Sequence, residues 1–62
     1  MQDIFRKSAH LSAVLLARTT AQPMDATELA LALDVAVADI PLLLGVASTS
    51  TPGLHARVDL EF

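Results

Sequence analysis

The sequence contains no cysteine, so neither a disulfide bond nor a thiolate metal site can stabilise the chain. Its two histidines, His10 and His55, are far apart and lack the spacing of metal ligands. We therefore expect no metal and no other cofactor. A chain of 62 residues buries only about 60% of the surface that its unfolded form exposes. Association is the remaining source of stability, which favours a homo-oligomer.

Basic residues are also few, and the net charge is −3. The four basic residues are Arg6, Lys7, Arg18 and Arg57. Proteins devoted to nucleic-acid backbones usually show a basic excess, so this composition disfavours DNA as the main partner. No apolar run is long enough to span a membrane, and polar residues interrupt the N-terminal segment, unlike a signal peptide. We expect a cytoplasmic protein without membrane contact.

Signals of catalysis are missing as well. With two glycines, the chain has no glycine-rich loop for a phosphate group. The Ser48–Thr51 stretch lacks the flanking glycines and paired base of an activated nucleophile, so a loop is the better interpretation. Asp25 and Glu28 have the spacing of a helix cap, which accounts for both carboxylates. We predict no catalytic residue and no enzymatic activity.

Apolar spacing predicts two helices in the first half of the chain. Over residues 2–18 an apolar stripe follows the helical period; its members are Ile4, Leu11, Val14 and Leu15, with Met1, Phe5 and Leu16 widening it. The segment 26–34 begins after a cap at Asp25 and ends at Asp34, a residue type that tolerates a left-handed corner. Leu31 points away from the expected buried face of this helix.

The second half is expected to hold a short helix and a hairpin. Capping by Asp39 places Pro41 in a first turn, where its missing N–H costs nothing, and predicts a helix over about 40–45. Residues 54–62 alternate between apolar and polar side chains after the turn pair Pro52-Gly53, which predicts a strand. Residues 46–50 are the expected partner strand. The predicted core consists of Leu11, Leu15, Leu29, Leu33, Ile40 and Val58.

The order of these elements resembles the winged-helix variant of the helix-turn-helix family. The stretch "TELALALDV", Thr27 to Val35, is similar to the family's second helix and the corner that follows it. The resemblance implies one α+β domain over residues 1–62, with three helices followed by a C-terminal β-hairpin. Yet Pro41 and Leu42 stand where the family tends to have base-contacting residues, and Asp39 is the only charged residue between Val35 and Gly45. The recognition helix is degenerate.

Exposed leucines favour a protein partner. Leu42, Leu43 and Leu44 span about 200° on a helix, so one face cannot bury all three. Together with the outward Leu31 and the unprotected edge of the final strand, they predict a contact surface. Its expected residues are Leu31, Leu42, Leu43, Leu60 and Phe62. We expect the chain to pair with itself as a homodimer and to bind a further protein.

Two functions follow from these patterns. The favoured one is a small non-catalytic regulatory or adaptor module that acts through protein–protein contacts. The alternative is a DNA-binding transcription regulator of the helix-turn-helix class, which would use basic residues outside the third helix. Its candidate nucleic-acid contacts are Arg6, Lys7, His55 and Arg57.

Overall fold

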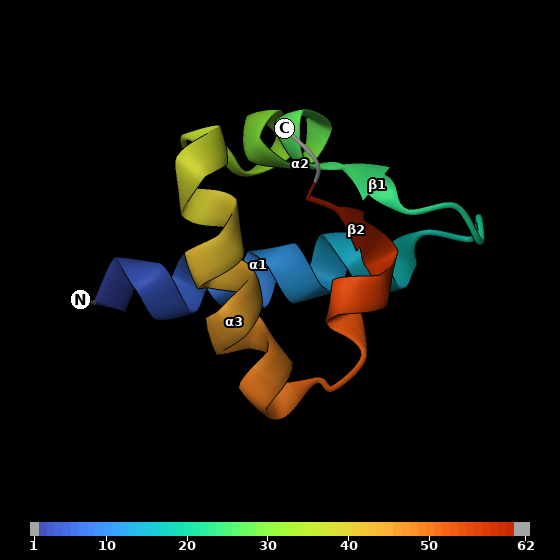
Figure 1. Cartoon of the computed structure of the whole chain (residues 1–62). Coiled ribbons are helices and arrows are strands. Elements are labelled where there is room, and N and C mark those ends of the chain that lie inside the picture. The colour runs from blue at the N-terminus through green and yellow to red at the C-terminus, as the bar shows by residue number, and fades with distance from the viewer. Residues whose placement is uncertain (1, 61–62) are drawn as a thin grey trace.

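The computed structural model describes residues 2–60, which form three α-helices, two short 3-10 helices and a two-stranded sheet (Figure 1). The elements in chain order are α1 (Gln2–Ala17), β1 (Met24–Asp25), α2 (Ala26–Leu33), η1 (Val37–Asp39), α3 (Ile40–Ser50), η2 (Leu54–Arg57) and β2 (Val58–Asp59). Helix α1 packs mainly against α3, and α2 closes the other side of the core. The expectation of a small α+β domain with three helices is confirmed.

The predicted boundaries of α2 are confirmed in detail. Asp25 is extended (φ −63°, ψ 133°), and its Oδ1 accepts a hydrogen bond from the Thr27 N–H at 2.9 Å. Asp34 adopts the left-handed conformation (φ 57°, ψ 49°) directly after the last helical residue. A short side chain of this type reverses the chain at little steric cost. The capping spacing also predicts a hydrogen bond between the Glu28 side chain and the Asp25 N–H, but among the described residues only the bond of Asp25 to Thr27 is present at this cap.

Helix α3 begins where the sequence predicted but extends further. Its first residue is Ile40 and Pro41 lies in its first turn, preceded by the single 3-10 turn η1. The predicted end near Gly45 is wrong, because the helix continues to Ser50. An exposed glycine within a helix costs only about 1 kcal/mol relative to alanine. Burial of Leu44 and Ala47 on either side of Gly45 offsets that cost.

Gly45→Ala is expected to raise the free energy of unfolding by about 0.5–1 kcal/mol, because alanine favours a helical interior. No atom lies within 4 Å of the Cβ that the substitution adds. Urea denaturation followed by circular dichroism measures the change. Gly53→Ala is the matched control: Gly53 has φ 93°, so alanine there should destabilise the chain by about 1–2 kcal/mol. A loss of stability in Gly45→Ala would mean that α3 ends at this residue.

The predicted C-terminal hairpin is wrong. Residues 46–50 belong to α3, and Leu54–Arg57 form the 3-10 helix η2. Only Val58–Asp59 is extended; it pairs in parallel with β1, with Met24 opposite Val58 and Asp25 opposite Asp59. A parallel pair requires a long crossover, which α2 and α3 supply. The described residues therefore contain no hairpin after the third helix to serve as a wing.

The alternation of apolar residues over 54–62 misled the sequence analysis for a physical reason. Leu54 and Val58 are buried, but Ala56 between them is exposed and Leu60 is half-buried. Burial therefore recurs at every fourth residue and not at every second one, which one helical turn followed by an extended residue provides and a strand does not. Gly53 supplies the positive φ of the predicted turn (93°). Phe62, the last member of the pattern, lies outside the described residues.

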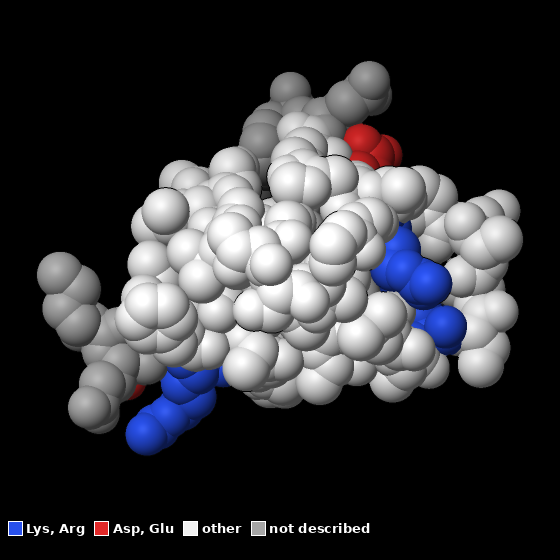
Figure 2. All heavy atoms as spheres, turned by 90° about the horizontal axis from the view of Figure 1, so that it is seen from below, with Lys and Arg blue, Asp and Glu red and all other residues white. Residues whose placement is uncertain are grey.

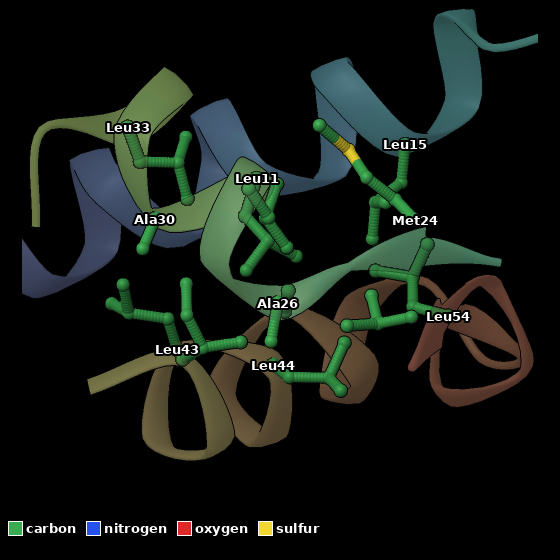
Figure 3. Packing of buried hydrophobic residues seen from close by; sticks show 13 residues of the cluster. Leu11, Leu15, Met24, Ala26, Ala30, Leu33, Leu43, Leu44 and Leu54 are labelled. Atoms are coloured by element: carbon green, nitrogen blue, oxygen red, sulfur yellow. The ribbon is translucent and has the colours of Figure 1, made fainter. Parts of the chain in front are cut away.

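The core is one cluster to which every helix contributes. All six predicted core residues are buried; the full set is Leu11, Leu15, Met24, Ala26, Leu29, Ala30, Leu33, Ile40, Leu43, Leu44, Ala47, Leu54 and Val58. Figure 3 shows the labelled side chains of α1, α2, α3 and η2 converging on a common centre. Ser8 is the one buried polar residue among those described, and its Oγ donates to the Phe5 carbonyl at 2.9 Å. This small side chain lies where α1 meets α3.

A single side chain links α1 to the end of α2. The Lys7 Nζ donates to the Leu33 carbonyl oxygen at 2.7 Å. Carbonyl groups in the last turn of a helix have no partner within the helix and carry its negative dipole end. The Lys7 ammonium therefore stabilises the C-terminus of α2 and fixes α2 against α1.

Candidate interaction surface

Four large apolar side chains are exposed among the described residues. Their exposed fractions are 66% for Phe5, 52% for Leu16, 78% for Leu31 and 57% for Leu42. Scattered exposed leucines are normal in a small protein, so each matters only if it belongs to an apolar patch. Two of these side chains, Leu42 and Phe5, border hollows of the surface.

Leu42 borders a hollow with a mainly apolar lining. This hollow, about 300 Å³ in volume, lies between the start of α1, the corner after α2 and the start of α3. Its lining residues are Asp3, Ile4, Lys7, Val35, Asp39, Leu42 and Leu43. We call it the leucine hollow. Its lining combines four apolar side chains with three charged ones, a mixture that is typical of protein contact surfaces.

Phe5 borders a second hollow on the other side of the contact between α1 and α3. This groove has a volume of about 340 Å³, and its lining is Phe5, Ser8, Ala9, Ser12, Val46, Ala47, Thr49, Ser50 and Thr51. Its hydroxyl groups make it more polar than the leucine hollow. Leu42 and Val46 are one turn apart on α3, so this helix borders both hollows with an aliphatic side chain.

The predicted partner residues lie in different environments. Leu31 and Leu42 are exposed, as the sequence analysis expected. Leu43 is only 4% exposed, because the phase of α3 turns it into the core, so it offers almost no surface to a partner. Leu60 is half-buried against the core. Phe62 lies outside the described residues, and its part of the prediction stays untested.

Sequence reasoning placed two of the exposed residues incorrectly. Phe5 and Leu16 were assigned to a broad buried stripe on α1, yet both are exposed. Each lies beside a residue of the true stripe, so an apolar count alone could not exclude them. The narrower period formed by Leu11 and Leu15, with half-buried Ile4 and Val14, was the better signal.

The four candidate nucleic-acid contacts do not form one surface. Arg6 and Lys7 lie in the first turns of α1, and the Lys7 ammonium is bonded to the Leu33 carbonyl. His55 and Arg57 lie in η2, and Arg57 shares a hollow with residues at the end of α1. About ten residues of α1 lie between Lys7 and the end of the helix. At a rise of about 1.5 Å per residue, the two regions are about 15 Å apart along the helix axis. Figure 2 accordingly shows basic side chains in separate groups with uncharged surface between them.

Ser48 and His55 form the only contact that resembles catalytic chemistry among the described residues. The Ser48 Oγ lies 3.1 Å from His55 Nδ1 and also donates to the Leu44 carbonyl at 2.7 Å. A hydroxyl has one proton, so while it donates to the Leu44 carbonyl its oxygen accepts from an Nδ1–H of His55. In that arrangement the imidazole does not act as a base toward the hydroxyl, which nucleophilic catalysis would require.

Within residues 2–60, no group of three or more metal-ligating side chains is arranged to hold an ion. No single helix in that range is long and apolar enough to cross a membrane. Helix α2 and the segment Val37–Ser50 meet the length and composition criteria only together, and they are bent by 99° at the break between them.

Comparison with known protein families identifies the chain. Residues 1–55 match the family described as "Folliculin-interacting protein C-terminus". The chain belongs to this family. No curated protein and no solved structure matches it significantly. The matched range contains α1, α2, α3 and all residues that line the leucine hollow and the groove beside Phe5.

Membership of the folliculin-interacting protein C-terminus family corrects the resemblance to winged-helix proteins, which is wrong. The stretch Thr27–Val35 lies inside the matched range, so the same residues belong to the folliculin-interacting family instead. The stretch describes little more than a capped amphipathic helix with a left-handed end. Many unrelated helices satisfy such a short apolar pattern, which explains why it misidentified the family.

Proposed function

We propose that this chain is a non-catalytic protein-interaction domain whose partner is folliculin. The observation that carries the proposal is the match of residues 1–55 to a family described by its interaction with folliculin. The favoured prediction from the sequence, a module that acts through protein contacts, agrees with this proposal. A cytoplasmic location remains an expectation from the sequence.

We assign the contact to the leucine hollow. Leu42 is the largest exposed apolar group of its lining, and Asp3, Lys7 and Asp39 provide charged groups at its edge. Partner side chains that cover Leu42 would remove apolar surface from water. Each Å² of apolar surface buried in this way contributes about 25 cal/mol of favourable free energy. The charged edge would then select among partners, because an unpaired charge at an interface is costly.

Self-association is the competing use of the same surface. The sequence argument for a homodimer relied partly on a nine-residue strand with an open edge, whereas β2 has two residues and pairs with β1. It also relied on a small core, whereas seven large side chains are fully buried. The exposed leucines alone do not distinguish a second copy from another protein. The family match therefore favours folliculin as the occupant.

A DNA-binding role receives no comparable support. The net charge is −3, and Figure 2 shows the basic side chains in separate groups. Neutralising phosphates along one face of a duplex requires several cations on one surface. Weak, non-specific binding to DNA at physiological salt is the expectation that follows.

Leu42→Asp is expected to weaken binding of purified folliculin at least tenfold, or by about 1.4 kcal/mol, because a carboxylate would be placed in the apolar centre of the contact. Isothermal titration calorimetry measures the dissociation constant. Leu16→Asp is the matched control, because Leu16 is similarly exposed (52%) but absent from the linings of the three hollows described. Both variants are checked for folding by circular dichroism.

Three results would count against this proposal in different ways. Failure of the unmodified chain to bind folliculin at tens of micromolar refutes the choice of partner. An equal loss in Leu16→Asp and Leu42→Asp refutes the leucine hollow as the contact. A stable dimer in ultracentrifugation, converted to monomer by Leu42→Asp, assigns the hollow to a second copy of the chain.

A further inference from the structure

The largest hollow of the three lies at the other end of the molecule from the start of α1. It has a volume of about 510 Å³ and is formed by the end of α1, the loop that follows it and the 3-10 helix η2. Its lining residues are Leu15, Arg18, Thr19, Thr20, Ala21, Gln22, Gly53, Ala56 and Arg57. We call it the arginine hollow. It shares no residue with the leucine hollow.

Charge is distributed unusually in this hollow. Two of the chain's four basic residues, Arg18 and Arg57, line it, whereas none of the described acidic residues does. Within residues 2–60 neither guanidinium forms a salt bridge. Two like charges that share one hollow repel each other, and an anion between them removes that repulsion.

Stabilisation of a helix end explains only one of these arginines. Arg18 directly follows α1, where a cation interacts favourably with the negative end of the helix dipole. Arg57 belongs to η2 and reaches the same hollow from the other side. The helix dipole therefore does not account for the presence of both arginines in one hollow, and ligand binding supplies an explanation.

The remaining lining groups suit an anion as well. A guanidinium presents N–H donors in a planar fork that pairs with both oxygens of a carboxylate. Thr20 Oγ1 accepts a hydrogen bond from the Gln22 N–H at 3.2 Å, which leaves its own O–H free to donate. The Thr19 hydroxyl and the Gln22 amide add further donors. Leu15 and Ala56 contribute an apolar part of the wall.

Size and net charge narrow the class of ligand. A volume of about 510 Å³ is in the range of sites that hold ligands of many atoms, and a single small anion would leave most of it to water. An extended nucleic acid would bring many phosphates to a chain of net charge −3, with only two cations to receive them. A short acidic peptide, in contrast, carries only a few negative charges, and these can all lie close to Arg18 and Arg57.

We propose that the arginine hollow binds an acidic segment of a protein partner, whose neighbouring carboxylates pair with Arg18 and Arg57. This site lies outside the leucine hollow and does not require folliculin as the partner. Both arginines are close to the surface, so binding should be modest in affinity and should weaken as salt is added.

The test uses the whole 62-residue chain and two synthetic peptides that differ only in charge. One is acetyl-GDEDEG-amide, and the other is its neutral counterpart acetyl-GNQNQG-amide. Nuclear magnetic resonance follows the Nε–Hε signals of the arginine side chains during each titration at low ionic strength. We expect the acidic peptide to shift the signals of Arg18 and Arg57 in a saturable way, and the neutral peptide to leave them unchanged.

Variants that remove one charge each assign the effect to the hollow. Arg18→Gln and Arg57→Gln should each weaken binding of the acidic peptide about fivefold, as the loss of an exposed ion pair predicts. Arg6→Gln is the matched control, because it removes the same charge from an exposed residue outside the hollow. It should change the affinity by about twofold or less.

Several outcomes overturn the proposal. Equal binding of the neutral peptide removes the role of charge, and equal weakening by Arg6→Gln shows a general charge effect without a site. If inorganic phosphate binds as tightly as the acidic peptide and shifts the same signals, the ligand of the hollow is a small anion and not a peptide. Binding of the acidic peptide by a chain that does not bind folliculin supports the arginine hollow and refutes only the proposed function.

Discussion

Leu33→Ala is expected to lower the free energy of unfolding by about 2–5 kcal/mol. Leu33 is the last residue of α2, is only 2% exposed and points into the core (Figure 3). Alanine would remove its apolar contacts and leave a cavity that the surrounding helices fill only in part. A domain of this size has a total stability of about 3–9 kcal/mol, at about 0.05–0.15 kcal/mol per residue. The expected loss is a large part of this total, so the variant should unfold at a much lower urea concentration than the unmodified chain.

Leu31→Ala on the same helix is the matched control for Leu33→Ala. Leu31 has the same side chain but is 78% exposed, so the substitution should change the stability by less than about 0.5 kcal/mol. Urea denaturation of both variants, followed by circular dichroism, measures the difference. Similar losses in the two variants would show that α2 buries both faces, which would remove Leu31 from the exposed surface.

The features that the sequence predicted well depend on neighbouring residues. The cap at Asp25 acts on a backbone N–H two residues away, and Asp34 reverses the chain by its own conformation. Pro41 restricts the start of α3 because of its missing N–H. Such effects are encoded within one helical turn. They could be identified without knowing how the helices pack.

The features that the sequence did not predict depend on contacts between distant segments. Strand β1 consists of Met24 and Asp25, and it exists because Val58 and Asp59 lie beside it. No local pattern indicates a two-residue strand. The alternation of apolar residues over 54–62 is compatible with a strand of a hairpin and with the observed 3-10 turn. The packing of this segment against α1 and α3 decides between the two structures.

The same distinction applies to the candidate sites. The run Leu42–Leu44 predicted at least one exposed leucine, and Leu42 and Leu43 were both expected at the surface. The phase of α3 determines that Leu42 is exposed and that Leu43 is buried. The arginine hollow escaped the sequence analysis entirely. Arg18 and Arg57 are far apart in the sequence, and the misassigned hairpin had placed Arg57 on the polar face of a strand.

Leu54→Ala tests the part of the fold that the sequence analysis misassigned, and it is expected to cost about 2–5 kcal/mol. Leu54 is 1% exposed and is the first residue of η2, where it fills the core between α1 and α3. Its loss should detach η2 and reduce the stability of the whole chain, because the 3-10 turn has few other buried groups. Urea denaturation measures the change as it does for Leu33→Ala.

Ala56→Gln distinguishes the 3-10 turn from the strand that the alternation predicted. In a strand with Leu54 and Val58 facing inward, residue 56 would face inward too, and a glutamine there would place an unpaired amide in the core. In η2 residue 56 is exposed, so the substitution should change the stability by less than about 0.5 kcal/mol. A large loss in Leu54→Ala together with no loss in Ala56→Gln requires burial at every fourth residue, which a strand cannot provide. Large losses in both variants would restore the strand and would also move Arg57, because the arginine hollow depends on η2.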